Sequence, residues 1–189
     1  MTDGELVTLS RQGNREAFAV LVGRWNPRLF RFLLRSLGDE DAARDTCQEA
    51  LFRAWVHLGR LREPEHFKTW LHSIALNLCR DRGRRSERRE VALGDAAALD
   101  DAVVDDASVL RESERRDGAL LLEAVLARLP MEQRTAIVLR ELEGFTSVEI
   151  AAMTGVPAAT IRSRIYYGLK ALRRMLPVDA SAQGGGTSR

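Results

Sequence analysis

Residues 160–172, TIRSRIYYGLKAL, alternate hydrogen-bond donors with aliphatic side chains at helical spacing. At about 100° per residue, Ile161, Ile165, Gly168 and Leu172 share one face. The opposite face combines long donors, small residues and planar rings, and it contains no acidic residue. Such a face suits the major groove, where arginine donates to guanine and serine bonds to a base or phosphate. A solvated face in a plain helical bundle is the alternative interpretation. The opposite face comprises Ala159, Arg162, Ser163, Tyr166, Tyr167 and Lys170.

The sequence shows no grouping of residue types that is typical of a catalytic site. It contains no carboxylate pair, glycine-rich phosphate loop, metal-ligand cluster or nucleophile with a neighbouring base. Cys47 and Cys79 lack a CxxC pattern or nearby ligands, so we expect two buried free thiols. His57, His66 and His72 are expected in solvated or capping positions. We therefore predict a protein that is not an enzyme and uses no cofactor or metal. An enzyme with a DNA-binding appendage is the alternative that an assay for ATP or phosphoester hydrolysis tests.

Capping and turn residues before position 160 predict the helices that position residues 160–172. The run TSVE at 146–149 is a capping box that opens a short helix over Ser147–Thr154. Gly155 suits the left-handed residue that ends such a helix, and Pro157 suits the first turn of the next one. The pattern of helix, glycine-containing turn and helix is a helix-turn-helix. Two further helices are predicted before it, over Ala119–Leu129 and over Glu132–Leu142, which ends near Gly144.

The first half of the chain is also predicted to be helical. Apolar residues recur at three and four from Glu16 to Leu37, where Gly38 ends the helix. A second helix runs over Asp39–Leu58, capped by Asp39 or Asp41, and a third starts near Glu65 after Pro64. No period-two alternation predicts a strand, so the fold class is all-α. The inward stripes are Ala42, Cys47, Leu51, Ala54, Trp55 and Leu58 in the second helix, and Phe67, Trp70, Leu71, Ile74 and Leu78 in the third.

The net charge of the chain is only +2, but its basic and acidic residues are concentrated in different segments. Residues 1–90 carry 17 basic and 13 acidic side chains, residues 91–114 carry 1 and 7, and residues 115–189 carry 11 and 7. The middle block is rich in alanine and aspartate and cannot bury enough apolar area to fold, so it is predicted to be an acidic flexible linker. Two small helical domains, 1–90 and 115–177, flank it, and a flexible tail follows at 178–189. The basic blocks favour a polyanionic partner.

No stretch approaches the roughly 20 apolar residues of a membrane span, and the first residues lack the order of a signal peptide. We therefore expect a cytoplasmic protein without membrane insertion.

Three stretches together resemble one protein family. The run LPMEQRTAIVLRELEGFTSVEIAAMTGVPAATIRSRIYYGLKALRRM resembles the helix-turn-helix of the fourth domain of bacterial sigma factors. DAARDTCQEALFRAW and FKTWLHSIALNLCRDRGRR resemble the two halves of the sigma second domain, in the same order. With a short linker in place of a third domain, the chain resembles the extracytoplasmic function (ECF) group of the sigma-70 family. The resemblance covers about 150 residues, including several independent motifs.

The resemblance implies two polymerase contacts. The helix like DTCQEALFRAW docks on the β′ clamp of core RNA polymerase, and the fourth domain meets the β flap. The residues matching the clamp contact are Asp45, Gln48, Glu49 and Arg53. Taken without the family, the same residues would be ordinary surface pairs one helical turn apart.

The resemblance also implies two contacts with promoter DNA. In the family, the loop before FKTW captures a base flipped out of the −10 element, and the next helix holds neighbouring nucleotides. The loop RLREPEHF departs from shorter family versions rich in small and acidic residues. Trp70 could stack on a base, although its place on the inner stripe favours core packing. The −10 candidates are Arg60, Arg62, His66, Lys68, Asn77, Arg80, Arg84 and Arg85, and the −35 candidates are Arg162, Ser163, Arg164, Tyr166 and Lys170.

The resemblance thus implies an ECF-type sigma factor. Such a protein binds core RNA polymerase, directs promoter-specific initiation through −10 and −35 recognition, and is usually held by an anti-sigma factor. The alternative is a conventional helix-turn-helix regulator that is not a polymerase subunit, which leaves the basic FKTW helix unexplained.

Overall fold

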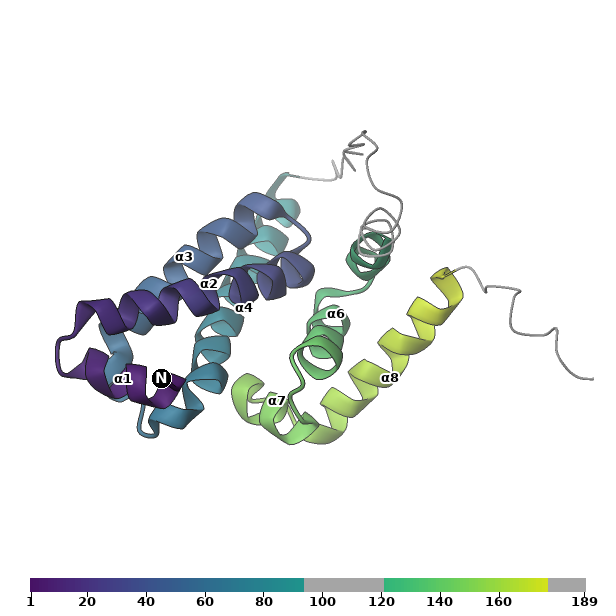
Figure 1. The fold of residues 1–189 in the computed structure, drawn as a ribbon. Coiled ribbons are helices and arrows are strands. Elements are labelled where there is room, and N and C mark those ends of the chain that lie inside the picture. The colour runs from purple at the N-terminus through teal and green to yellow at the C-terminus, as the bar shows by residue number, and fades with distance from the viewer. Residues whose placement is uncertain (94–120, 177–189) are drawn as a thin grey trace, which may run out of the picture.

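The computed structural model describes the backbone of residues 1–93 and 121–176, and the side chains of 1–82 and 121–176. Every regular element in these ranges is helical, which confirms the predicted all-α fold (Figure 1). The helices form two groups, α1–α4 and α6–α8, that lie side by side (Figure 1). The predicted tail and nearly all of the predicted linker lie outside the described residues.

Two long helices form the frame of the first group. Helix α2 (Arg15–Leu37) begins at Asn14, whose side chain accepts an amide hydrogen bond, and ends at Gly38 with φ of 75°. Helix α3 (Glu40–His57) is capped by Asp39, as predicted, and packs along α2. A polar side chain satisfies free amides at the start of both helices, and at the end of α2 a glycine adopts the left-handed conformation.

Helix α1 (Asp3–Arg11) was not predicted. It opens with a capping box in which Thr2 accepts from the Glu5 amide and the Glu5 carboxylate accepts from the Thr2 amide. The run TDGE that forms this box has the same pattern as TSVE, so the signal was present in the sequence.

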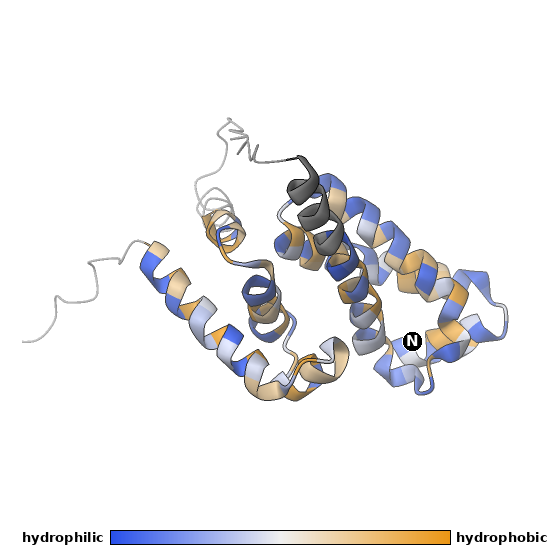
Figure 2. Ribbon diagram, turned by 180° about the vertical axis from the view of Figure 1, so that it is seen from behind, coloured by the Kyte–Doolittle hydropathy of each residue, from blue (hydrophilic) through white to orange (hydrophobic). Residues whose placement is uncertain are grey.

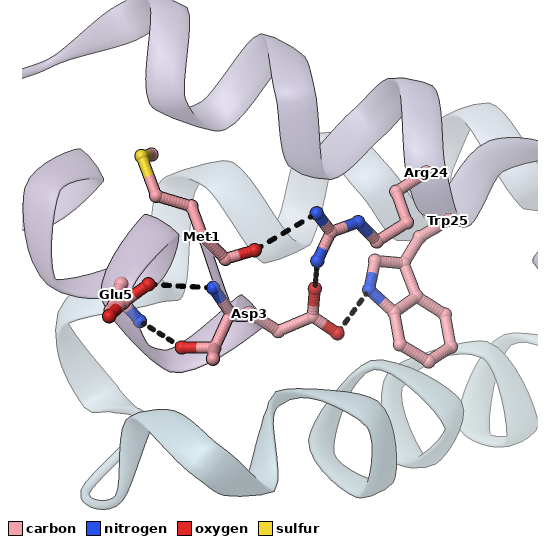
Figure 3. Close-up of polar contacts among 6 residues, drawn as sticks. Met1, Asp3, Glu5, Arg24 and Trp25 are labelled. Atoms are coloured by element: carbon pink, nitrogen blue, oxygen red, sulfur yellow. Dashed lines mark hydrogen bonds and ion pairs between the residues drawn. The ribbon is translucent and has the colours of Figure 1, made fainter.

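A polar cluster anchors α1 to α2, as Figure 3 shows. The Asp3 carboxylate accepts a hydrogen bond of 3.0 Å from the Trp25 indole and forms an ion pair with Arg24. Arg24 also donates to the Met1 carbonyl at 3.2 Å. Because the Trp25 ring is buried, its N–H needs such a partner, and Asp3 supplies it.

The connection after α3 contains two short 3-10 turns, η1 (Leu58–Arg60) and η2 (Pro64–His66). Helix α4 (Phe67–Leu93) follows directly, so Pro64 stands in the turn that leads into the helix. Phe67 and Leu71 of the predicted inner stripe are buried in the core.

Two tryptophans depart from the predicted stripes. Trp55 is 37% exposed at the edge of α3, where its ring lies 4.7 Å from Phe18, so its placement on the inward stripe was wrong. Trp70 is half-buried, 6.1 Å from the Phe67 ring, with part of its surface accessible. A large ring at the margin of a helix stripe packs one face and leaves the other open.

The second group begins with a helical segment over 121–127, inside the range predicted for its first helix. Helix α6 (Met131–Ile137) continues into a π-helical segment, η3 (Val138–Leu142), and Gly144 follows with φ of 77°. The helix predicted to end near Gly144 is thus confirmed, with a wider last turn than expected.

The helix-turn-helix is confirmed in detail. Helix α7 (Ser147–Thr154) is opened by the capping box of Thr146 and Glu149, and Gly155 ends it with φ of 67°. Helix α8 (Ala158–Met175) begins just after Pro157, which occupies the capping position and not the first turn.

Buried apolar residues form one cluster that runs through both groups. Helix α2 contacts α6, and α4 contacts α7; apolar and polar residues are interspersed along these helices, as the hydropathy colours of Figure 2 show. The sequence predicted two units, but nothing in its periodicity indicated this direct contact between them.

Candidate nucleic-acid and polymerase interfaces

Helix α8 presents the predicted polar face to solvent. Ile161, Gly168 and Leu172 are buried against α6, as the helical spacing predicts. Gly168 lies so close to α6 that an added Cβ would stand 2.6 Å from Ile137 Cδ1. This close approach fixes the rotation of α8, and therefore which side chains face outward.

The outward face of α8 gathers most of the −35 candidates. Arg162, Ser163, Tyr166 and Lys170 are exposed, and the helix contains no acidic residue. The Tyr166 ring meets its neighbour Tyr167 edge-on at 5.3 Å. Such a surface, with cationic donors beside planar rings, can bond to phosphates and base edges.

Arg164 differs from the other −35 candidates. Its side chain is half-buried and forms an ion pair with Glu132 of α6. This pair braces α8 against α6, so Arg164 would have to leave Glu132 or share its donors to reach DNA.

The −10 candidates are divided between the loop before α4 and several faces of α4. Arg62, His66 and Trp70 line a groove of about 440 Å³, together with Glu149 and Met153 of α7. His66 Nδ1 lies 2.9 Å from the Glu63 carboxylate, and Arg60 and Asn77 are exposed. Trp70 and Arg62 would suit a base and its phosphate, but the carboxylates of Glu63 and Glu149 also line the groove, and α7 forms one side of it.

The remaining −10 candidates do not join this groove. Lys68 is half-buried and directs its amine to the Glu143 carbonyl in the second group. Arg80 lines a second cavity, of about 460 Å³, between α4 and the helix-turn-helix. Arg84 and Arg85 lie on α4, and their side chains are outside the described residues.

The four clamp candidates lie together in a shallow groove between α3 and α4. Asp45 is 3.5 Å from Arg82 of α4, and Glu49 accepts from Arg53 at 2.6 Å. Phe52, between them, is 61% exposed. The sequence analysis missed Phe52, although its position directly after the buried Leu51 is out of phase with the inner stripe. An exposed aromatic ring in the same groove as charged pairs is typical of a protein-binding surface.

His72 is a further residue that the sequence analysis placed wrongly. It was expected in solvent but is 0% exposed, with the rings of Phe32 and Phe145 each 5.1 Å away. Its Nε2 lies 3.3 Å from the Glu143 carboxylate. The helical spacing of His72, Leu76 and Cys79 could have indicated its burial, because these residues form a second stripe on α4 that faces the other group of helices.

The environment of Glu143 favours its charged form. Burial by itself raises the pKa of this carboxyl, but the contact with His72 and the charges of Lys68 and Arg35 bring the pKa below its ordinary value. Glu143 is therefore a carboxylate held among cations.

A buried arginine also joins the two groups. Arg134 of α6 donates to the Leu37 carbonyl at the end of α2, at 3.2 Å, and to the Ala127 carbonyl at 3.3 Å. Carbonyls at a helix end lack partners within the helix, and Arg134 supplies one from across the interface.

The two cysteines are buried, as predicted. Burial raises the pKa of Cys47 to about 11 and that of Cys79 to about 12, so both remain thiols near neutral pH. Across the described residues, no group of three His, Cys, Asp or Glu side chains could hold a metal ion. In the same part of the chain, no helix combines the length and apolarity that crossing a bilayer requires.

Comparisons with known proteins agree with this division into two groups. Residues 21–89 match the family model of sigma-70 region 2, and residues 119–172 match that of sigma-70 region 4. The chain is 33% identical to the RNA polymerase sigma-H factor of Pseudomonas aeruginosa over 180 residues, which cover 92% of this chain and 93% of the relative. It is 32% identical to the ECF RNA polymerase sigma factor SigW of Bacillus subtilis over 177 residues, covering 88% and 92%.

Two solved structures share the fold. One is the sigma factor RpoE in complex with the anti-sigma factor NepR from Bartonella quintana, with a TM-score of 0.67, 26% identity and coverage of 86% of this chain and 98% of that one. The other is CnrH in complex with the cytosolic domain of CnrY, with a TM-score of 0.63, 28% identity and coverage of 94% and 99%.

Proposed function

The chain belongs to the ECF group of the sigma-70 family, and we propose which of its surfaces bind polymerase and which bind promoter DNA when transcription starts. Residues 1–90 bind the β′ clamp of core RNA polymerase and the separated −10 strand. Residues 115–177 bind the −35 duplex and the β flap, and residues 91–114 are the connection between the two domains. Polymerase supplies all bond chemistry, so this chain is not itself an enzyme and acts in the cytoplasm beside polymerase.

The observation that carries this proposal is the acid-free outer face of α8. Arg162, Ser163, Tyr166 and Lys170 are exposed together on the second helix of a helix-turn-helix, the helix that enters the major groove in this motif. Arg162 reads base edges, and Lys170 bonds to the phosphate backbone. Neither domain selects a promoter alone, because linking two weak modules raises the effective concentration of the second once the first has bound.

The polymerase contact rests on the groove between α3 and α4. Asp45 and Glu49 meet basic groups of the clamp, Gln48 and Arg53 bond at its edges, and Phe52 supplies apolar area at the centre. An anti-sigma factor is a further proposed partner, since RpoE is seen in complex with the anti-sigma factor NepR and CnrH in complex with the cytosolic domain of CnrY.

The −10 contact rests on the groove beside the loop before α4. Trp70 stacks on a base, and Arg62 and His66 bond to the adjoining backbone. Outside the groove, Lys68, Arg60 and the arginines of α4 are further cations for the phosphate backbone, and the Asn77 amide is a neutral hydrogen-bonding group. A regulator that is not a polymerase subunit is not favoured, because it leaves the match of residues 21–89 to sigma-70 region 2 without a role.

Run-off transcription with purified core polymerase on a promoter library tests the function. We expect start sites that depend on this chain and share two sequence elements, one near −10 and one near −35. Failure to direct core polymerase to any start site would overturn the proposal.

A further inference from the structure

Contacts with the rest of the first domain fix the position of helix α1. Leu6 and Val7 are 0% exposed and belong to the apolar core. At the start of the helix, the Asp3 carboxylate accepts from the Trp25 indole and pairs with Arg24 of α2 (Figure 3). A nine-residue helix is marginal by itself, so these contacts keep α1 in place against the domain.

From this position α1 contacts both ends of the loop that precedes α4. At the first end, Arg11 Nε donates to the Leu58 carbonyl at 3.2 Å. The same carbonyl accepts from the Leu61 amide at 3.3 Å, which is the bond that closes the η1 turn. At the second end, the Glu65 carboxylate of η2 lies over Gly4, where an added Cβ would stand 2.9 Å from Glu65 Oε1. One helix therefore holds the loop at two points.

The loop over residues 58–66 carries three of the −10 candidates. Arg60, Arg62 and His66 are all exposed on it. Its backbone forms two 3-10 turns, and short turns of this kind have poorer hydrogen-bond geometry than an α-helix. Contacts from outside the loop therefore determine how precisely its cations are placed. A loop that is already ordered loses less conformational freedom when it binds its target.

We propose that α1 positions this loop for the −10 strand, and that Arg11 acts through its bond to the Leu58 carbonyl and not through its charge. The inference rests on the proposed function, which assigns the loop to −10 DNA. Arg11 is a positioning residue, because its hydrogen bond ends on protein backbone. Without that bond the Leu58 carbonyl retains only the Leu61 amide. The exposed cations of the loop then adopt more orientations, and −10 sequences are distinguished less well.

Two substitutions of Arg11 separate the hydrogen bond from the charge. Glutamine, like arginine, has a nitrogen attached to Cδ, so Arg11→Gln keeps a donor at the place of Nε and removes the charge. Methionine has a similar length but no N–H, so Arg11→Met removes both. Arg15→Met is the matched control. Arg15 is exposed at the start of α2, and within the described part of the chain it forms no hydrogen bond with the loop.

Two measurements on the full chain follow the loop and its DNA contact. Hydrogen exchange reports how often the amides of residues 58–66 open. Run-off transcription with core polymerase, on promoters that vary only at −10 or only at −35, reports sequence preference. We expect Arg11→Met to speed exchange in the loop and to lower the preference for the best −10 sequence, each by about fivefold, since one hydrogen bond is lost. Arg11→Gln and Arg15→Met should match the parent in both measurements, and the −35 preference should stay constant throughout.

Two results would overturn the inference. One is an unchanged −10 preference in Arg11→Met. The other is an equal loss in Arg11→Met and Arg11→Gln, which would show that the charge itself contacts phosphate.

Failure of the proposed function has a different signature. A parent chain that directs core polymerase to no start site would refute that function. Hydrogen exchange then decides the structural part of the inference: faster exchange in Arg11→Met than in Arg11→Gln would support the hold of α1 on the loop, and equal exchange would refute it as well.

Discussion

The close contact between α8 and α6 at Gly168 leads to a quantitative prediction. Gly168 of α8 faces α6, where an added Cβ would lie 2.6 Å from Ile137 Cδ1 and 3.3 Å from Gln133 Cβ. Replacing glycine by alanine within a helix stabilises it by about 1 kcal/mol. Overpacking a filled interface costs about 1 to 3 kcal/mol. We therefore expect Gly168→Ala to lower the free energy of unfolding by about 1 kcal/mol and the melting temperature by about 2 to 4 °C.

A second substitution identifies the cause. Ile137→Val removes Cδ1, the atom nearest to the added Cβ, and by itself costs about 0.5 to 1.5 kcal/mol. In the Ile137→Val background, Gly168→Ala should cost less than in the parent, or stabilise, with a coupling of about 1 kcal/mol. Gly23→Ala is the matched control, because this helical glycine has open space around its Cβ position and the change should stabilise α2.

Urea denaturation followed by circular dichroism measures all five proteins. Equal effects of Gly168→Ala in the two backgrounds would refute the packing argument, as would a gain in stability equal to that of Gly23→Ala. Gly168 lies on the face of α8 opposite to the DNA candidates, so the folded variant should retain its preference among −35 sequences.

Further predictions concern the interfaces and the titrating groups. Arg162→Ala should lower discrimination among −35 variants by about 1 to 3 kcal/mol in a binding assay, and unchanged discrimination would count against base readout. The double variant Asp45→Ala, Glu49→Ala should weaken assembly with core polymerase and spare DNA binding, so normal assembly in a pull-down would contradict the clamp contact. Because the pKa of Glu143 is below its ordinary value of 4.5, the stability that its charged form contributes to the fold is full above that pH and is lost as the pH falls through the lowered pKa, which urea denaturation at a series of pH values should show. Cys79, with its pKa raised to about 12, should not react with a thiol reagent at pH 8 until the protein unfolds, and fast labelling of the native protein would show that its burial is transient.

Helix boundaries were the most predictable part of the structure. Asp39, Thr146 and Glu149 cap helices where the sequence predicted caps, and Gly38 and Gly155 end helices in the left-handed conformation. These signals act within four residues, so they can be read without knowing the fold. The outward face of α8 was predictable for the same reason, because one helical period determines it.

Contacts between distant segments were not predictable. Lys68 and Glu143 are 75 residues apart, and no local pattern pairs them. His72 was expected in a solvated or capping position because no carboxylate or cysteine stands at ligand spacing from it, whereas the rings of Phe32 and Phe145 enclose it. Helix α1 was missed for a different reason: a nine-residue helix is marginal alone, and its contacts with α2 stabilise it.

The bond from Arg134 to the last carbonyl of α2 links the folding of the two halves of the molecule. The C-terminal end of α2 in one domain takes a partner from α6 in the other, and a single apolar cluster continues beneath both. The intact chain should therefore melt cooperatively as one unit, and each half expressed by itself should have a lower melting temperature. Two well-separated calorimetric transitions in the intact chain would show instead that the halves melt independently.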